Sequence, residues 1–300
     1  MDLKEPLSIE QQISRLAEHG MIIKPGNESE VEDFLNRVSY YRLSGYTMHH
    51  RKTENDSDFI KGSCTFEGTK ALYEFDQELR NLLREYLEIV EIYFRMQIAH
   101  HFAMAKCVKP PHDQHYDRNN FYSKEHYDQV MADFEKQKKY FKDSMVAQHH
   151  QTKYQDKYPI WVMAEMLSFS NLSKLYSAMY YSEKDAIAKA VGSGRGILVN
   201  NLHCLSVLRN KCAHGGRLCN MKLSPPVQIN KKFLRKYPEI ANDTLFAFLL
   251  VLLKRLPTDE DRLQLVDRLR QLIKKHREID LKLFGFPESY ETILQAILAP

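Results

Sequence analysis

The stretch LYEFDQELRNLLREYLEIVEIYFR, residues 72–95, decides the fold of this chain. Its apolar residues recur in steps of three and four, the spacing that places side chains on one face of an α-helix. The pattern begins near Gly68, continues to about Lys106, and is followed by a Pro-Pro pair at 110–111 that ends a helix. The apolar stripe comprises Leu72, Phe75, Leu79, Leu82, Leu83, Tyr86, Ile89, Val90, Tyr93, Phe94 and Ile98. We therefore predict one long amphipathic helix.

Helical periodicity extends over most of the remaining chain. Ser8 with Gln11, and Ser29 with Glu32, form capping-box patterns that predict the starts of two helices, and Thr258 suits the N-cap of a later one. Further helices are predicted at 160–180, 183–191, 196–214, 239–255, 259–276 and 288–298. The 300 residues include only 11 glycines and 11 prolines, too few for the turns of an all-β fold. The predicted fold class is therefore all-α.

The character of the sequence changes along the chain, and these changes suggest an organisation. Residues 1–67 are predicted as an N-terminal helical region, within which 42–66 is polar and irregular and is expected to be a loop with one short extended piece. Residues 68–276 are predicted as an irregular helical bundle, interrupted by a polar insertion at about 112–157 that carries one or two helices. Residues 277–300 form a C-terminal helical tail in this prediction.

Composition restricts the partners and the compartment. A net charge of +4 is compatible with a nucleic-acid partner but does not require one. The N-terminus lacks the apolar segment of a signal peptide, and the longest apolar run, TLFAFLLVLL at 244–253, is too short to span a bilayer. The five cysteines have no paired spacing, so reduced thiols are expected. We expect a cytoplasmic protein with no membrane partner.

A second stretch, LSVLRNKCAHGGRL at 205–218, carries the candidate chemistry. Asn210 and His214 are four residues apart, which are neighbouring positions on a helix, and Arg209 lies beside them. Gly215 suits the left-handed residue that follows a helix end, so His214 is expected in the last turn. The preceding leucines anchor the helix. The sequence thus predicts a rigid polar cluster at a helix tip.

This set of residue types suits RNA cleavage by the RNA's own 2′-hydroxyl. Histidine titrates near neutrality and can move the proton, and the arginine fork can hold the phosphate charge, with no metal and no other cofactor. Asn210 could orient either group. The same Arg–His spacing also occurs at Arg42/His49 and Arg270/His276, and a C-terminal helix cap with solvated charges is the alternative interpretation.

The nearby cysteines and Glu165 suggest two other roles. Cys204, Cys212 and Cys219 lie close to histidines, but their spacings of seven and six match no zinc finger or ribbon, and small apolar packing groups are the preferred interpretation. No metal site is predicted. Glu165 lies in an otherwise apolar helix, where it could pair with Arg209 or face solvent at the helix edge.

The motif RNKCAHGGRLCN resembles the arginine–asparagine…histidine motif of HEPN-domain ribonucleases. More narrowly, the chain resembles the Abi-like abortive-infection family (AbiD/AbiF type), through VSYYRLSGY at 38–46, residues 72–95 and PIWVMAEMLSFSNLSKLY at 159–176. The similarity covers most of residues 7–225. It departs at Ser170-Asn171, where the family usually has a glycine, and at Gly215-Gly216, where polar residues are common.

The resemblance implies a HEPN-type helical bundle and a phage-defence endoribonuclease that is toxic to the infected cell, as in toxin–antitoxin systems. By this resemblance Arg209 and His214 form the catalytic pair, Asn210 supports them, and two copies form a homodimer. The alternative is a catalytically silent HEPN protein that binds a small structured non-coding RNA in a ribonucleoprotein. A helical adaptor without RNA chemistry is a third hypothesis.

RNA binding is predicted from lysines that border aromatic residues, since rings stack on bases and lysines meet phosphates. The candidates in these runs are Lys136, Lys138, Lys139, Lys142, Lys231 and Lys232, and Lys211 and Arg217 are further candidates at the Arg–His motif itself. The neighbouring rings are Tyr140, Phe141, Phe233 and Tyr237. A reserve cluster is Tyr41, Arg42, Tyr46 and Arg51. Solvated helix faces remain the alternative interpretation for each basic run.

Overall fold

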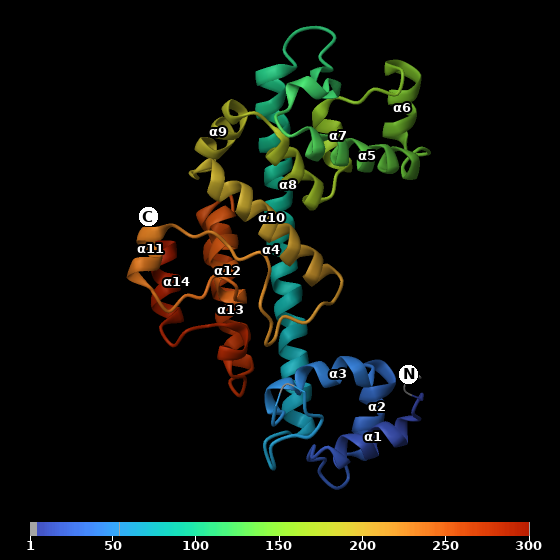
Figure 1. Cartoon of the computed structure of the whole chain (residues 1–300), viewed down its shortest axis with the longest axis vertical. Coiled ribbons are helices and arrows are strands. Elements are labelled where there is room, and N and C mark those ends of the chain that lie inside the picture. Colours follow the sequence, from blue (N-terminus) through green and yellow to red (C-terminus); the bar gives the residue numbers. More distant parts are fainter. Residues whose placement is uncertain (1–4, 54, 300) are drawn as a thin grey trace.

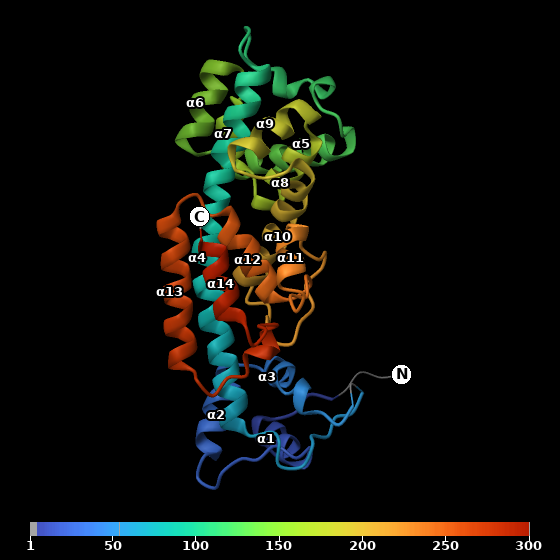
Figure 2. The same ribbon diagram turned by 90° about the vertical axis from the view of Figure 1, so that its left-hand side faces the viewer.

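One helix forms the axis of the molecule. The computed structural model describes residues 5–53 and 55–299. Within it, α4 (Phe66–Lys106) has 41 residues and is therefore about 60 Å long. The Thr65 side chain caps this helix by accepting the Gly68 N–H at 3.1 Å. The predicted long helix is confirmed, and Figures 1 and 2 show it running through most of the length of the molecule.

The other elements are arranged along α4. At its start lie α1 (Ile9–Glu18), α2 (Glu28–Arg37), α3 (Tyr40–Tyr46) and the 3₁₀ turn η1 (Met48–His50). Beside its far half lie η2 (Gln114–Tyr116), η3 (Arg118–Asn120), α5 (Lys124–Tyr140), α6 (Met145–Tyr154), α7 (Ile160–Met166), α8 (Phe169–Ala178) and α9 (Tyr181–Ala190). Its middle is covered by α10 (Arg195–Ala213), α11 (Lys231–Lys236), α12 (Leu245–Arg255), α13 (Asp259–Lys275), η4 (Leu281–Phe284) and α14 (Tyr290–Leu298).

The all-α class is confirmed. Over residues 5–53 and 55–299 the β-type pairing is limited to two isolated bridges, Ile22 with Thr65 and Arg51 with Phe59. None of the helices in the same ranges is both long enough and apolar enough to cross a membrane. The apolar run at 244–253 belongs to α12, which is short and buried among other helices.

Several predicted boundaries were wrong. Residues 160–180 form two helices, because Ser168 interrupts the pattern and caps α8 by accepting the Asn171 N–H at 3.3 Å. The helix expected from residue 239 begins only at Leu245. Ser29 lies inside α2 and does not cap it, since the N-cap is Asn27 without a side-chain hydrogen bond.

The segment predicted as a loop at 42–66 also contains helix. Its first five residues, 42–46, all belong to α3, which Ser39 caps by accepting the Arg42 N–H at 3.3 Å. Leu43 and Tyr46 of α3 are buried, so packing against the rest of the fold stabilises this helix. The short polar sequence alone does not predict that packing. The Ser8–Gln11 capping box and the Thr258 cap are both present.

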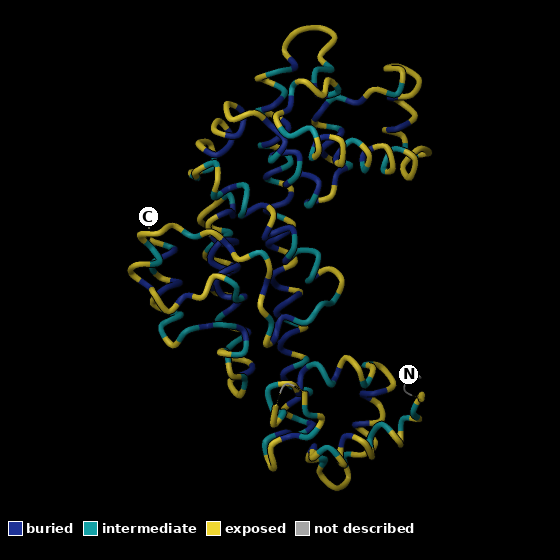
Figure 3. The backbone as a smooth tube through the Cα atoms, in the orientation of Figure 1, coloured by how far each residue is buried: buried dark blue, intermediate teal, exposed yellow. Residues whose placement is uncertain are grey.

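Two apolar clusters stabilise the fold. The small one belongs to the N-terminal region and contains Leu16, Val31, Phe34, Leu35, Leu43 and Phe66 among others. The large one is centred on α4, α8, α10 and α12, and Figure 3 shows the buried segments concentrated there. Helix α5 contributes Val130 and Phe134 to the large cluster and packs on α8, while α14 packs on α12 and α13. The predicted polar insertion is thus partly built into the main core.

Candidate functional site

Helix α10 carries the Arg–His motif to its C-terminal end. The helix is held by buried leucines, Leu198, Leu202, Leu205 and Leu208. It ends at Ala213, and His214 is the C-cap. Gly215 has a φ of +65°, and the Gly215 and Gly216 N–H groups donate to the carbonyls of Cys212 and Lys211 at 3.3 and 2.7 Å. This double hydrogen-bonded helix end is the arrangement for which Gly215 is suited.

A buried carboxylate fixes Arg209. The Arg209 Nε lies 3.1 Å from an oxygen of Glu91 on α4, whose side chain is only 5% exposed. The other Glu91 oxygen accepts from Arg95 at 2.6 Å. Glu91 therefore neutralises two guanidinium groups at once, which offsets part of the cost of burying it. The Arg209 side chain remains 35% exposed, so its fork is oriented but still reaches solvent.

Asn210 bridges the two motif residues. Its backbone carbonyl accepts the His214 N–H at 3.0 Å, and its side-chain oxygen lies 3.4 Å from an Arg209 nitrogen. Five positions along a helix turn side chains about 140° apart, so Arg209 and His214 are not on one helical face. His214 lies at the point where the helix stops, is exposed, and its imidazole forms no hydrogen bond within residues 5–53 and 55–299.

The N-terminal region contacts the loop that follows the motif. Arg42 of α3 donates to the Gly215 carbonyl at 2.6 Å. Arg217 lies against Gly45 of α3, and one of its nitrogens is 3.4 Å from the sulfur of Met48 and 3.3 Å from that of Met221. The guanidinium of Arg217 is therefore packed between two parts of the fold.

A second buried carboxylate lies where the chain leaves the motif. Asp76 of α4 accepts the Leu218 N–H at 3.2 Å, the Arg80 guanidinium at 2.5 Å, and the Tyr46 hydroxyl. Burial raises the pKa of Asp76, whereas Arg80 and the Leu218 N–H favour its charged form. Burial beside Asp76 also raises the pKa of Tyr46. The network joins α3, α4 and the loop after α10.

Comparison with known proteins identifies the family. Residues 33–220 match the family described as Abi-like protein. The chain belongs to this Abi-like family. No curated protein and no solved structure matches it. The family indicates a role in abortive-infection defence against phage, and the matched residues include α3, α4 and the whole of α10 with its motif.

The side chains that contact the motif could be predicted only in part from the sequence. Glu165 pairs with Arg95 at 3.4 Å and not with Arg209. Glu91 was missed, although it lies between stripe positions Val90 and Phe94 of the long helix, where an acidic residue signals a buried partner. Arg42 could not be assigned, because its contact with Gly215 depends on how α3 docks.

The predicted RNA-binding lysines are not gathered in one place. Lys136, Lys139 and Lys142 are exposed on or just after α5, although Lys136 pairs with Asp133 at 3.1 Å. Lys138 is only 12% exposed, pairs with Asp156 at 2.6 Å and lies over the rings of Phe134 and Tyr158. Lys138 is thus placed as a structural cation, a position that its sequence run does not reveal.

The second basic run lies on α11, away from the motif. Lys231 and Lys232 are exposed, but Phe233 packs against the core and Tyr237 is buried. Figure 1 places α11 on one side of α4 and the C-terminal end of α10 on the other. Lys211 lies at the motif itself, half-buried beside Gly216. In the reserve cluster Tyr41 and Arg42 are exposed, whereas Tyr46 is buried.

The cysteines of the Abi-like chain are packing groups. Cys204, Cys212 and Cys219 are buried, and burial raises the pKa of Cys212 and of Cys219 to about 12. The thiols therefore stay protonated and apolar at neutral pH. Among the residues that the structure describes, no three His, Cys, Asp or Glu side chains are grouped so that they could hold a metal ion.

Proposed function

We propose that this Abi-like protein is a metal-independent endoribonuclease of abortive infection, with its site at the C-terminal end of α10. The observation that supports the proposal is the contrast within the motif. Arg209 is oriented by buried Glu91, while His214 is exposed and its imidazole carries no bond to any described residue. A fixed cation and a free imidazole at the same helix end suit a reaction that needs a charge clamp and a proton carrier.

In the proposed reaction His214 accepts the proton of an RNA 2′-hydroxyl. The 2′-oxygen forms a bond to the adjacent phosphorus while the bond from phosphorus to the 5′-oxygen breaks. The leaving oxygen takes a proton from an acid, and the products are a 2′,3′-cyclic phosphate and a 5′-hydroxyl. Arg209 stabilises the negative charge on the phosphate oxygens, and the side-chain oxygen of Asn210, 3.4 Å from an Arg209 nitrogen, helps to orient that arginine.

Among the described residues, one chain brings a single exposed imidazole, that of His214, to the end of α10, yet the reaction needs a base and an acid. A second copy would supply the other histidine across a two-fold axis, and the exposed tip that carries His214 and Tyr41 is the surface we propose for this isologous contact. Lys136, Lys139 and Lys142 remain the proposed RNA contacts of the α5 region, while Lys138 is committed to Asp156.

The test compares two histidines of the same helix. His214→Ala should lower the cleavage rate at least about 10³-fold, because it removes the proton carrier. His203→Ala, at an exposed histidine about three turns before His214 on α10, is the matched control and should cleave like the wild type. Arg209→Lys should lower the rate by about 10²-fold, since an ammonium cannot reproduce the fork.

The readouts are the RNA product ends and the rate in EDTA. Cyclic phosphate ends and an unchanged rate in chelator are expected. A rate that EDTA abolishes and magnesium or zinc restores would contradict the mechanism. A fully active monomer at the assay concentration would contradict the two-copy site.

A second function is favoured by the ion pair of Arg209. An arginine whose Nε forms an ion pair with a buried glutamate could serve the fold alone, and the protein would then bind a small structured RNA without cutting it. Purification of the protein with its RNA, followed by mapping of the RNA ends, separates the two functions. In the silent case the wild type and His214→Ala carry the same RNA with the same ends.

A further inference from the structure

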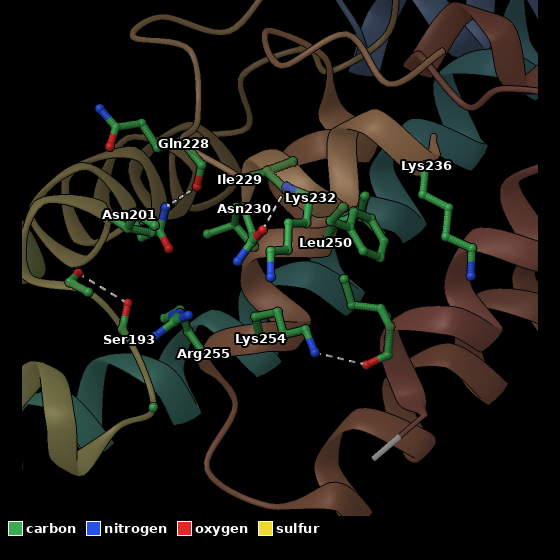
Figure 4. A pocket seen from close by; sticks show the side chains of 16 residues that line it. Ser193, Asn201, Gln228, Ile229, Asn230, Lys232, Lys236, Leu250, Lys254 and Arg255 are labelled. Carbon is green, nitrogen blue, oxygen red and sulfur yellow. Dashed lines mark hydrogen bonds between the residues drawn. The ribbon is translucent and has the colours of Figure 1, made fainter. Parts of the chain in front are cut away.

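The other end of α10 borders a cavity that the proposed nuclease site does not use. It has a volume of about 570 Å³ and lies between the first turns of α10, the chain from Gln228 to Lys236, and the end of α12. Figure 4 shows the lining side chains from close by. Cavities of 300–1,000 Å³ are the usual size for a small organic ligand.

The charges of the cavity are all of one sign. Lys232 and Lys236 of α11 and Lys254 and Arg255 of α12 line it, whereas the described lining includes no aspartate and no glutamate. The three lysines are exposed and Arg255 is buried, so positive charge extends from the rim to the interior. Four cations around one hollow attract an anion and repel other cations.

Arg255 is the most unusual of the four. It is only 8% exposed, its Nε has no hydrogen-bond partner in the described part of the chain, and its one hydrogen bond is to the Val191 carbonyl at 3.5 Å. Burial and the nearby Arg262 lower the pKa of Arg255 to about 10, which still leaves it charged at neutral pH. A buried cation without a carboxylate is costly, and an anion in the cavity would remove that cost.

The remaining walls are mainly apolar. Ile197, Ile229, Phe233, Leu250 and Val251 supply the apolar surface. Asn201 adds a side-chain amide that donates to the Gln228 carbonyl at 3.0 Å. Such a cavity suits a ligand with a charged group at one end and a flat apolar body at the other.

We infer that this cavity binds the phosphate of a ribonucleotide, with Arg255 and the α11 lysines on the phosphate and the apolar walls on the base. The nucleotide can be free or can be the phosphorylated end of an RNA strand, since both present the same group. The site is independent of the proposed nuclease: Asn201 is thirteen residues, or about 20 Å, from His214 along α10.

The experiment uses the full-length protein and titration calorimetry with the four ribonucleoside 5′-monophosphates, the matching nucleosides and inorganic phosphate. At least one monophosphate, or a trinucleotide with a 5′-phosphate, should bind at least about 10-fold more tightly than the same compound without its phosphate. Binding of the free monophosphate identifies a nucleotide site, and binding of the trinucleotide alone identifies an RNA-end site.

Two double variants form a matched pair. Lys232→Ala/Lys236→Ala removes two cavity lysines and should weaken binding by about 10-fold or more. Lys222→Ala/Arg235→Ala removes the same charge from exposed positions outside the cavity and should change binding less than about 2-fold. Equal effects of the two double variants would overturn the site, because they would indicate non-specific attraction.

Arg255→Met separates a ligand-binding arginine from a structural one. Because none of the described carboxylates pairs with Arg255, the apolar variant should melt at the same temperature as the wild type or higher in the absence of ligand, and should lose nucleotide binding. A lower melting temperature with unchanged binding would overturn the inference. It would also fail if no monophosphate or 5′-phosphorylated trinucleotide binds, or if the nucleoside or inorganic phosphate alone binds as tightly.

Discussion

The two ends of α10 treat positive charge in opposite ways. At the C-terminal end, Arg209 is held by buried Glu91 and Arg42 by the Gly215 carbonyl, so the cations there are positioned by the protein itself. At the N-terminal end, buried Arg255 faces a hollow lined by lysines and by no described carboxylate. Cations that are held by groups of the protein itself suit a preorganised reactive site. Cations without a carboxylate partner suit the binding of an anionic ligand, which supplies the negative charge.

The region that matches the Abi-like family includes one end of α10 with its surroundings but only part of the site at the other end. Residues 33–220 contain the motif and both of its supports on α3 and α4. Of the cavity, only the part formed by residues 192–201 is matched, while α11, α12 and Ile297 lie beyond. We infer that the motif belongs to the shared Abi-like core and that the cavity is assembled when the C-terminal helices pack against that core.

Removal of Glu91 tests whether the cations at the motif end are held by the protein itself. Glu91→Ala leaves Arg95 and Arg209 without their shared buried carboxylate and should lower the free energy of unfolding by about 3 kcal/mol. Urea unfolding measures this loss. Glu88→Ala, one turn earlier on α4 and exposed, is the control and should change stability by less than about 0.5 kcal/mol. Similar values for the two variants would show that Glu91 does not hold the arginines.

Asp76 tests whether the motif end is supported by a second buried acid. Asp76→Asn keeps the size of the side chain but weakens its bonds to Arg80 and the Leu218 N–H, and we expect a loss of about 2 kcal/mol. Glu74→Gln, an exposed neighbour on the same helix, is the matched control. Amide hydrogen exchange should report faster opening at residues 214–220, and unchanged exchange there would contradict the role of Asp76.

Sequence reasoning recovered what repeats along one helix. The stripe within 72–95 predicted α4, and the leucines before Arg209 with Gly215 after it predicted where α10 ends, since periodicity and end signals are local. The capping-box pattern at Ser29 is equally local, but it predicted the wrong helix start because Ser29 lies inside α2. The partner of Arg209 is on another helix 118 positions earlier, and no spacing rule reaches that far.

The unrecognised features depend on packing between distant segments. Lys138 reads as one of several lysines, yet the fold places it over Tyr158 and against Asp156. In the sequence, Arg255 is simply the basic residue at the end of an apolar helix. Only the packing around α12 shows that it is buried and that no described carboxylate pairs with it. A charge pattern in the sequence therefore says little about which cations are free.

The smallest expected effect is a pH dependence beside the motif end. His49 of η1 is half-buried, and burial is the main cause that lowers its pKa to about 4, followed by the neighbouring His50. Asp280 opposes this shift, and Arg217 adds a smaller lowering. An unfolded histidine titrates near 6.5, so below that pH the unfolded chain binds a proton that the folded chain refuses. Stability should be constant above about pH 7, fall as the pH drops through 6.5, and level off near pH 4.

Because His49 keeps some contact with solvent, we expect a loss of less than about 1 kcal/mol between pH 7 and pH 4.5 from this residue. Urea unfolding across this range measures the loss. His49→Gln should flatten the curve, whereas His203→Gln, on the exposed face of α10, should leave it unchanged. Burial also lowers the pKa of His50, so the double variant His49→Gln/His50→Gln should have a shallower slope than His49→Gln. Some slope should remain in the double variant, because burial lowers the pKa of His101 and His115 as well. A double variant with a slope as steep as that of the wild type would show that the acid sensitivity does not arise at His49 and His50.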